Sequence, residues 1–271
     1  MADPMLSLRQ SYAILVGSRV RAQLAYRSSF VVNALTAFAI GALEFTELYV
    51  LLATVPTLGG LTLIQVALVF ALANTAFSLA DLVFGQLDQI NRYLREGKLE
   101  AFLVRPLPLM AQLVSADFQL RRAGRMVFAL LVGAVVLIQA DLVVDTRTVY
   151  LLIITPFVGA AIYGALFALA GGLQFWLVDG AEFTNAFVYG GAYAGQIPGS
   201  TLLLPIRVLF TFVIPATVVA YLPAMLILRL PGPALLPSWL GWLAPLFAVW
   251  IWLFSLLVWR AGIRRFTGAG G

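Results

Sequence analysis

Few side chains in this sequence are suited to covalent chemistry or metal binding. The 271 residues include no cysteine and no histidine, which excludes disulfides and thiol nucleophiles and removes the commonest general base and metal ligand. Gly97 and Lys98 are the nearest approach to a phosphate-binding loop, but the upstream glycine and the following Ser or Thr of that motif are missing. We therefore expect no catalytic residue, metal site or cofactor in this chain.

Glu44 and Glu47 are the acidic pair that stands out, because they occur three residues apart in an apolar stretch and would share one face of a helix. Counting along a helix from Ser28 places them roughly 24 and 28 Å from its start, toward the far interface. Two interpretations remain open. The pair contacts a cation or proton on a substrate path, or both glutamates lie at the headgroup level. Asp81 and Asp88 are expected at the opposite interface.

The composition indicates which kind of structural element carries these acidic residues. Hydrophobic residues make up 62% of the chain and charged residues 11%, whereas a soluble domain is about a quarter charged. We predict one domain (1–271) of an all-α integral membrane protein with six transmembrane helices. The predicted spans are 28–52, 61–84, 126–139, 149–177, 207–228 and 239–259. Residues 1–27 are expected to form an amphipathic interfacial helix, and the Gly- and Pro-interrupted residues 187–205 a bent or interfacial segment.

The 17 basic residues indicate the orientation. With six spans, Arg147 and Arg229 lie on one side of the membrane and the other 15, including Arg207, lie on the side of the two termini. Because basic residues accumulate in cytoplasmic loops, both termini and the loop 85–125 are predicted to be cytoplasmic. Because the basic residues cluster in loops beside the lipid bilayer, the net positive charge gives no reason to expect nucleic acid as a partner.

The loop stretch 91–108 is a long polar interruption with its own pattern. Gly97 is suited to end the helix that enters it, and residues 98–104 can form a short amphipathic helix. Its apolar residues Leu99, Phe102 and Leu103 would share one face. Arg105 before Pro106 disfavours further helix. Such an element could dock onto a soluble partner, or it could be an ordinary loop kept soluble by its charges.

Two further patterns lie in the spans. Phe70, Asn74, Phe77 and Ser78 on the second predicted span, with Phe210 and Phe212 on the fifth, form aromatic or semi-polar stripes that either pack or line a substrate cavity. On the fourth span Ala160, Gly164, Ala168 and Gly172 recur every four residues, which allows close helix packing, expected within the subunit.

Several motifs, in order along the chain, resemble the permease subunit of type-2 ABC exporters, in the bacterial branch where two related permeases pair with one ATPase. The family's loop pattern of an arginine, Gly-x-Leu-Glu and Leu-x-Arg-Pro occurs at Arg95, 97–100 and 103–106. The sequence LAYR precedes the first span, residues 214–224 match the family's Ile-Pro and Tyr-Leu-Pro-Ala motifs, and residues 259–271 are similar to its ending.

The resemblance implies a function. The chain would be the transmembrane subunit of an ATP-driven exporter of the bacterial inner membrane, effluxing a lipophilic or amphipathic compound. ATP and Mg²⁺ would bind a separate ATPase, present in two copies, and the second permease would be a related, non-identical chain. Residues 98–104 would be the coupling helix. The implied ATPase-coupling residues are Arg95, Gly97, Lys98, Leu99, Glu100, Phe102, Leu103, Arg105 and Pro106.

The substrate path would run between the two permeases and include the stripe residues with Glu44 and Glu47. A hypothesis from another class stays open: an ATP-independent, ion-coupled carrier or channel that uses Glu44 and Glu47 as ion contacts.

Overall fold

The computed structural model describes residues 8–116, 118–177, 179–233 and 235–266, and no strand occurs among them. The α-helices are α1 (Leu8–Ala25), α2 (Arg27–Thr54), α3 (Leu63–Phe84), α4 (Ile90–Arg95), α5 (Glu100–Leu103), α6 (Leu109–Ala116), α7 (Ala123–Gln139), α8 (Thr146–Leu173), α9 (Ala181–Gly195), α10 (Leu204–Val208), α11 (Ala216–Val219), α12 (Tyr221–Ile227) and α13 (Ala244–Arg265). Short 3₁₀ helices are η1 (Gly85–Gln89), η2 (Leu120–Arg122), η3 (Gly199–Thr201) and η5 (Ser238–Leu243), and η4 (Leu209–Val213) is a π-helix. The protein is thus an all-α integral membrane protein, as predicted.

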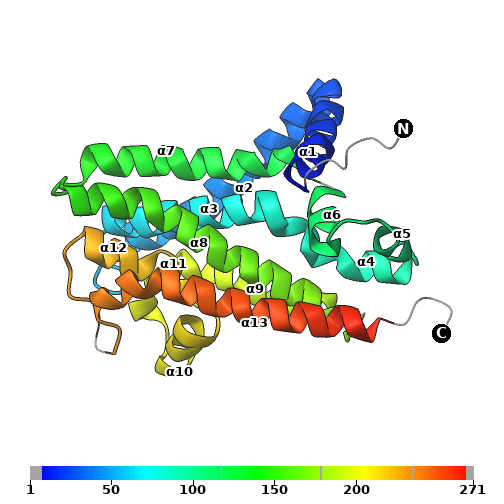
Figure 1. Ribbon diagram of the computed structural model, residues 1–271. Coiled ribbons are helices and arrows are strands. Elements are labelled where there is room, and N and C mark those ends of the chain that lie inside the picture. Colours follow the sequence, from blue (N-terminus) through cyan, green and yellow to red (C-terminus); the bar gives the residue numbers. More distant parts are fainter. Residues whose placement is uncertain (1–7, 117, 178, 234, 267–271) are drawn as a thin grey trace.

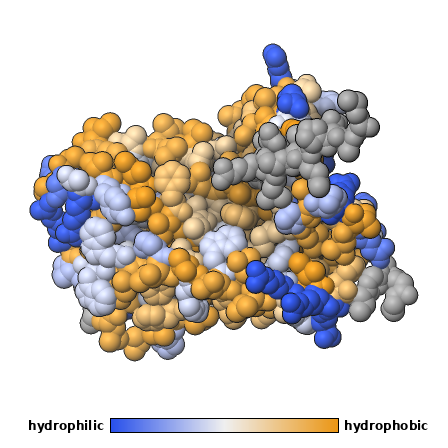
Figure 2. Space-filling view, viewed as in Figure 1, coloured by the Kyte–Doolittle hydropathy of each residue, from blue (hydrophilic) through white to orange (hydrophobic). Residues whose placement is uncertain are grey.

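The long helices run between two ends of the molecule (Figure 1). At one end lie α1, α4 to α6 and the C-terminal end of α13, and we call it the basic end. At the other lie the turns 55–62 and 140–145 and the segment 228–237, and we call it the turn end. Hydrophobic residues cover much of the side of the bundle in Figure 2, and hydrophilic residues gather toward its two ends. This distribution is the one expected for helices that cross a bilayer.

Helix α3 is the centre of the bundle. It packs against α7 and α8, and α8 packs in turn against α13. The small residues of α8 permit both approaches: a Cβ added at Gly172 would meet the backbone of Trp259 in α13 at 3.1 Å, and one added at Gly164 would meet Phe84 at the end of α3. The predicted use of the four-residue repeat in packing within the subunit is confirmed at these two glycines.

Five helices or helix runs are long and apolar enough to cross a membrane: Arg27–Thr54, Leu63–Arg95, Leu120–Gln139, Thr146–Leu173 and Ser238–Arg265. They correspond to the first four predicted spans and the sixth. A further pair, Leu204–Val213 and Ala216–Ile227, passes the same test jointly but is bent by 64° at a short break. This pair occupies the predicted fifth span.

The predicted fifth span at 207–228 is wrong, because both of its ends lie at the turn end. At its start, Arg207 donates to the carbonyl of Ser200 at 2.8 Å, and the Ser200 hydroxyl donates to the carbonyl of Gly59 at 2.7 Å. Just beyond its other end, Arg229 pairs with Asp145 at 2.7 Å. The bent pair is therefore a re-entrant segment that enters and leaves at the same end.

Helix α9 makes the remaining crossing. Asn185, in its first half, donates to the carbonyl of Asp88 toward the basic end, and the chain after it reaches Gly59 at the turn end through Ser200. Its 15 residues extend about 22 Å, and the following segment completes the passage. Residues 187–205 thus include half of a crossing helix, and six crossings remain.

Arg207 consequently lies on the other side from the prediction. With Arg207 at the turn end beside Ser200, three of the 17 basic residues belong to that end, Arg125 is paired with Glu44 inside the bundle, and 13 belong to the basic end. The charge asymmetry used for the orientation is reduced but keeps its sign.

Helix α1 covers most of the predicted interfacial segment. Its Gln23 side chain fixes it to the loop before η2, donating to the carbonyl of Phe118 and accepting from the backbone N–H of Leu120 at 2.8 Å. The first seven residues of that prediction, and 267–271 of the predicted family ending, lie outside the described residues.

Candidate functional site

The first candidate region is the loop unit, defined as η1 to α6. Gly97 ends α4 with a φ of 63°, and Lys98 N–H returns to the carbonyl of Tyr93 at 3.0 Å while Gly97 N–H bonds Leu94 at 3.3 Å. This left-handed turn satisfies carbonyls that a helix end leaves free. The predicted helix stop at Gly97 is confirmed.

The helix that follows differs from the prediction in length and in face. Helix α5 covers only Glu100–Leu103, not 98–104. Leu99 is fully buried, whereas Leu103 is 44% and Val104 84% exposed. Phe102 turns back onto Tyr93, with ring centroids 5.5 Å apart. The three apolar residues predicted to share a face therefore divide, because Leu99 and Phe102 anchor the element and Leu103 does not.

Residues 103–106 form the outermost part of the loop unit, which we call the loop tip. Leu103, Val104, Arg105 and Pro106 are all exposed. The base beneath them is fixed, since Gln112 donates to the carbonyls of Phe102 at 2.9 Å and Leu107 at 2.8 Å. The tip therefore presents apolar surface on a braced support.

The charged residues beside the tip form exposed ion pairs. Arg95 pairs with Asp179 at 2.8 Å, and Lys98 pairs with Glu96 at 2.6 Å. The hydrogen bond and charge of Lys98 lower the pKa of Glu96, with Arg92 contributing. Pairs this exposed contribute little to stability, so these side chains can rearrange when another surface approaches.

A buried polar junction connects the loop unit to the crossing helices. Gln174, fully buried at the end of α8, accepts from the backbone N–H of Asn91 at 2.8 Å and donates to the carbonyl of Asp88 at 2.9 Å. It also donates to Thr184 of α9 at 3.2 Å, and Tyr189 donates to the Asp88 carboxylate at 2.6 Å. Asp88 lies just after α3 at the basic end, and its side chain is buried between η1 and α9.

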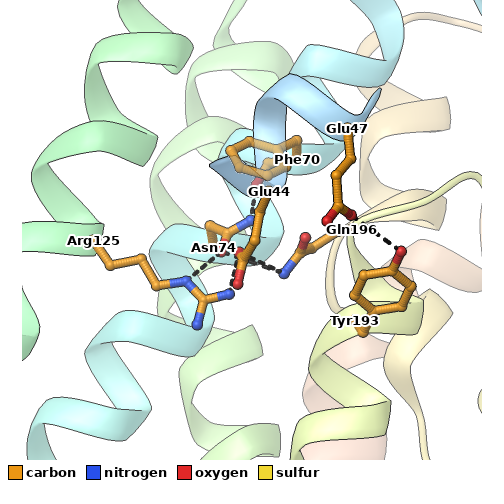
Figure 3. A network of polar contacts seen from close by, with 7 residues as sticks. All are labelled: Glu44, Glu47, Phe70, Asn74, Arg125, Tyr193 and Gln196. Atoms are coloured by element: carbon orange, nitrogen blue, oxygen red, sulfur yellow. Dashed lines mark hydrogen bonds and ion pairs between the residues drawn. The ribbon is translucent and has the colours of Figure 1, made fainter. Parts of the chain in front are cut away.

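The second candidate region is a polar network inside the bundle, formed by Glu44 of α2, Asn74 of α3, Arg125 of α7 and Gln196 after α9 (Figure 3). Arg125 forms an ion pair with Glu44 and donates to the Asn74 amide oxygen at 3.0 Å. Gln196 donates to Glu44 at 3.3 Å and to Asn74 at 3.5 Å. Four segments of the chain are thus joined at one point.

The network lies at mid-depth in the bundle. Asn74 is at the middle of α3, and a Cβ added at Gly41 of α2 would meet the Arg125 side chain at 3.4 Å. Glu44 therefore does not lie at the headgroup level. The Arg125 guanidinium also lies 5.0 Å from the ring centroid of Phe77, which adds a cation–π contact to its ion pair.

Glu47 has a different environment. It is exposed on α2, and the hydroxyl of Tyr193 donates to it at 3.4 Å. In Figure 3 Glu47 and Tyr193 lie apart from the Arg125 side of the network. The two glutamates thus share a helix face, as expected, but only Glu44 is charge-paired.

The residues of the predicted stripes do not lie together. Phe70, Asn74, Phe77 and Ser78 are buried in the interior of the chain. Phe210 is half-buried and Phe212 exposed, and Phe212 contacts Phe247 of α13 at 6.3 Å between ring centroids. A substrate path between subunits that includes the α3 stripe would require these helices to separate, so that part stays a prediction.

Sequence reasoning missed the partners of these sites. Arg125 was assigned to the loop but lies inside α7, 81 residues from Glu44 along the chain. Gln174 and Gln196 were not singled out, and no local pattern marks them. One signal was present: a neutral glutamine within an apolar stretch needs partners when it is buried.

Comparison with protein families decides the class of protein. A model of the ABC-2 family transporter protein matches residues 38–270, which is most of the chain. The chain belongs to the ABC-2 transporter family. It is therefore the membrane component of an ABC transporter, as the motifs of the loop had indicated. Comparisons with curated proteins and with solved structures found no match.

Membership in the ABC-2 family indicates the kind of complex in which the loop unit works. Members of this family are membrane transport components, in general without catalysis of their own, and they associate with an ABC ATPase. Among the described residues no group of three acidic, histidine or cysteine side chains could hold a metal ion.

Proposed function

We propose that this chain is the transmembrane subunit of an ATP-driven exporter and that the loop tip docks onto the ATPase. The observation that carries this proposal is the braced apolar tip: Val104 is 84% exposed beside Leu103, on a support held by Gln112. Apolar side chains presented in this way are common where a partner completes the surface. The basic end would then be cytoplasmic.

The junction supports a transmission role for the loop unit. A force applied at the tip passes to α4, and the hydrogen bond from Asn91 to Gln174 connects α4 to the end of α8. Gln174 and Asp88 bond α9 in turn through Thr184 and Tyr189. Buried bonds of this kind are costly to break, so ATP-driven motion of the tip would displace α8 and α9 together.

The rest of the assembly follows the family resemblance. We propose two ATPase copies with bound ATP and Mg²⁺, a second permease that is related but not identical, and a bacterial inner membrane. A lipophilic or amphipathic substrate suits the aromatic side chains of Phe210 and Phe212. The network gives less support to an ion-coupled carrier, because Glu44 is already paired with Arg125.

Purification of the tagged chain from its native membranes in mild detergent tests the proposal. We expect an ABC ATPase and a second six-span protein among the companions that mass spectrometry identifies. The purified complex should hydrolyse ATP.

Reversing the charges of Glu100 and Arg105 together should uncouple ATP hydrolysis from transport while the chain stays folded. Recovery of the chain alone, with ion-driven flux in liposomes that Glu44→Gln abolishes, would replace the exporter with the carrier.

A further inference from the structure

A cavity of about 440 Å³ lies at the basic end where α1 meets α2. It is bordered by α1, by the first turns of α2 and by residues 118–121. The lining residues used below are Arg19, Tyr26, Ser29, Phe30, Phe118 and Arg121. None of them belongs to the loop tip, the junction or the intramembrane network.

The wall of this cavity is held in place by hydrogen bonds. Gln23 connects α1 to the backbone of Phe118 and Leu120, so that both sides of the cavity are fixed relative to each other. Gln119 accepts from Arg121 Nε at 2.9 Å and from its Nη2 at 2.6 Å. This orients the guanidinium of Arg121 but leaves further N–H donors on it.

The charge of the cavity is positive. Arg19 and Arg121 are exposed, and across the described part of the chain neither forms an ion pair with a carboxylate. The partner of Arg121 is a neutral amide, so its charge is not compensated there.

The other lining residues suit the remainder of an amphipathic anion. Tyr26, Phe30 and Phe118 supply aromatic surface, and Ser29 in the first turn of α2 supplies a hydroxyl. The site lies where an interfacial helix turns into a crossing helix, which is the depth of lipid headgroups. A soluble anion would use the arginines but not the aromatic wall.

We propose that this cavity binds the phosphodiester headgroup of an anionic phospholipid from the leaflet at the basic end. Arg19 and Arg121 hold the phosphate oxygens, Ser29 bonds the headgroup, and Tyr26 and Phe30 contact the glycerol and first methylenes. A bound lipid joins α1 and α2 to the segment that connects the loop unit with α7. It therefore stabilises the position of α1 against the rest of the chain.

The test titrates the full-length chain in non-ionic detergent with dioctanoyl phosphatidylglycerol, counting bound copies by native mass spectrometry. We expect one saturable copy and at least tenfold weaker binding of dioctanoyl phosphatidylcholine. Removing both charges with Arg19→Gln and Arg121→Gln should weaken binding by about tenfold for each arginine, since hydrogen bonds to charged groups have that strength. Saturable competition by millimolar inorganic phosphate would assign the site to a soluble anion instead and overturn the proposal.

Two further variants separate the cavity from general surface charge and from misfolding. Arg21→Gln with Arg27→Gln removes the same charge from exposed residues that do not line the cavity, and binding should be retained. Ala22→Trp fills the cavity and keeps every charge, so it should abolish binding. Equal loss in the Arg21 and Arg27 control, or undiminished binding in Ala22→Trp, would contradict the proposal.

Discussion

At the loop tip, Leu103 and Val104 expose apolar side chains, whereas inside the bundle Arg125 and Glu44, whose side chains are only 18% and 22% exposed, pair opposite charges. Each arrangement is the reverse of what its surroundings favour, because water is unfavourable to apolar groups and a bilayer core to charges. The network resolves the conflict within the chain, through Asn74 and Gln196. The tip does not, and this difference indicates that the tip, unlike the network, needs a partner.

The largest expected effect comes from breaking the network. Arg125→Leu leaves Glu44 without its counter-charge inside the bundle, which should destabilise the fold by on the order of 3 kcal/mol. A lowered temperature of aggregation in detergent measures it. The double variant Arg125→Leu with Glu44→Gln removes both charges and should recover part of the loss. If the double variant is no more stable than the single one, the ion pair is not the reason for the effect.

A second prediction concerns the tip. Val104→Asp places a charge in the proposed interface and should lower ATPase co-purification by tenfold or more, the effect expected of a central interface residue. Val144→Asp is the matched control, since Val144 is 74% exposed at the turn end. Neither change should lower thermal stability, because neither side chain is buried. Equal recovery of ATPase with both variants would show that the tip is an ordinary loop.

Breaking the junction should lower the stability of the chain less than breaking the network does. Its effect should also be more local than that of changing the tip. Gln174→Leu removes the acceptor of the Asn91 N–H and one donor to the Asp88 carbonyl, which keeps its bond from Asn185. The Asn91 N–H left without a partner should cost about 1–3 kcal/mol. Amide hydrogen exchange should become faster in α4, while the Gly97 turn changes little. Unchanged exchange at Asn91 would mean that the loop unit is not held through Gln174.

The smallest effect is expected from an exposed ion pair, Asp145 with Arg229 at the turn end. The Thr148 backbone N–H and side chain, and then Arg229, lower the pKa of Asp145. A carboxylate with a lowered folded-state pKa stabilises the protein above its unfolded pKa, near about 4, and this contribution is lost as the pH falls through the folded value.

The difference in Tm between the wild type and Asp145→Ala should therefore be small at pH 7 and should shrink as the pH falls below about 4. Asp141→Ala, in the same turn, is the control, because Asp141 forms no ion pair among the described residues. A difference that grows on acidification would reverse the sign of the argument. A large difference at pH 7 would remove the contrast between this exposed pair and the Arg125–Glu44 pair inside the bundle.

Much of the fold was predictable because long apolar runs bounded by charges can adopt few structures in a bilayer. Helices α2, α3, α7 and α8 begin or end within a few residues of the predicted spans. The length of the apolar runs did not predict that α9 makes the fifth crossing and that the bent pair enters and leaves at the same end. Hydrophobicity does not distinguish a crossing from a re-entrant segment, although Pro215 inside the predicted span lacks the backbone N–H that a straight helix uses.

The candidate sites were predictable in part for a different reason. Gly97 is recognisable because its conformation is a local property of the backbone. The pairing of Glu44 with Arg125 depends on how α2 and α7 pack, and neither residue carries that information in its neighbours. The same holds for Gln174, whose partners come from three other segments.

Site-directed cross-linking from the loop tip tests the central claim most directly. The chain contains no cysteine, so Val104→Cys and Val144→Cys each provide a single attachment point for a photoactivatable maleimide in native membranes. The proposed docking predicts a cross-linked product from Val104→Cys that contains an ABC ATPase, identified by mass, and none from Val144→Cys. A tip that labels fully and cross-links to no ATPase in membranes where the transporter is active would contradict it.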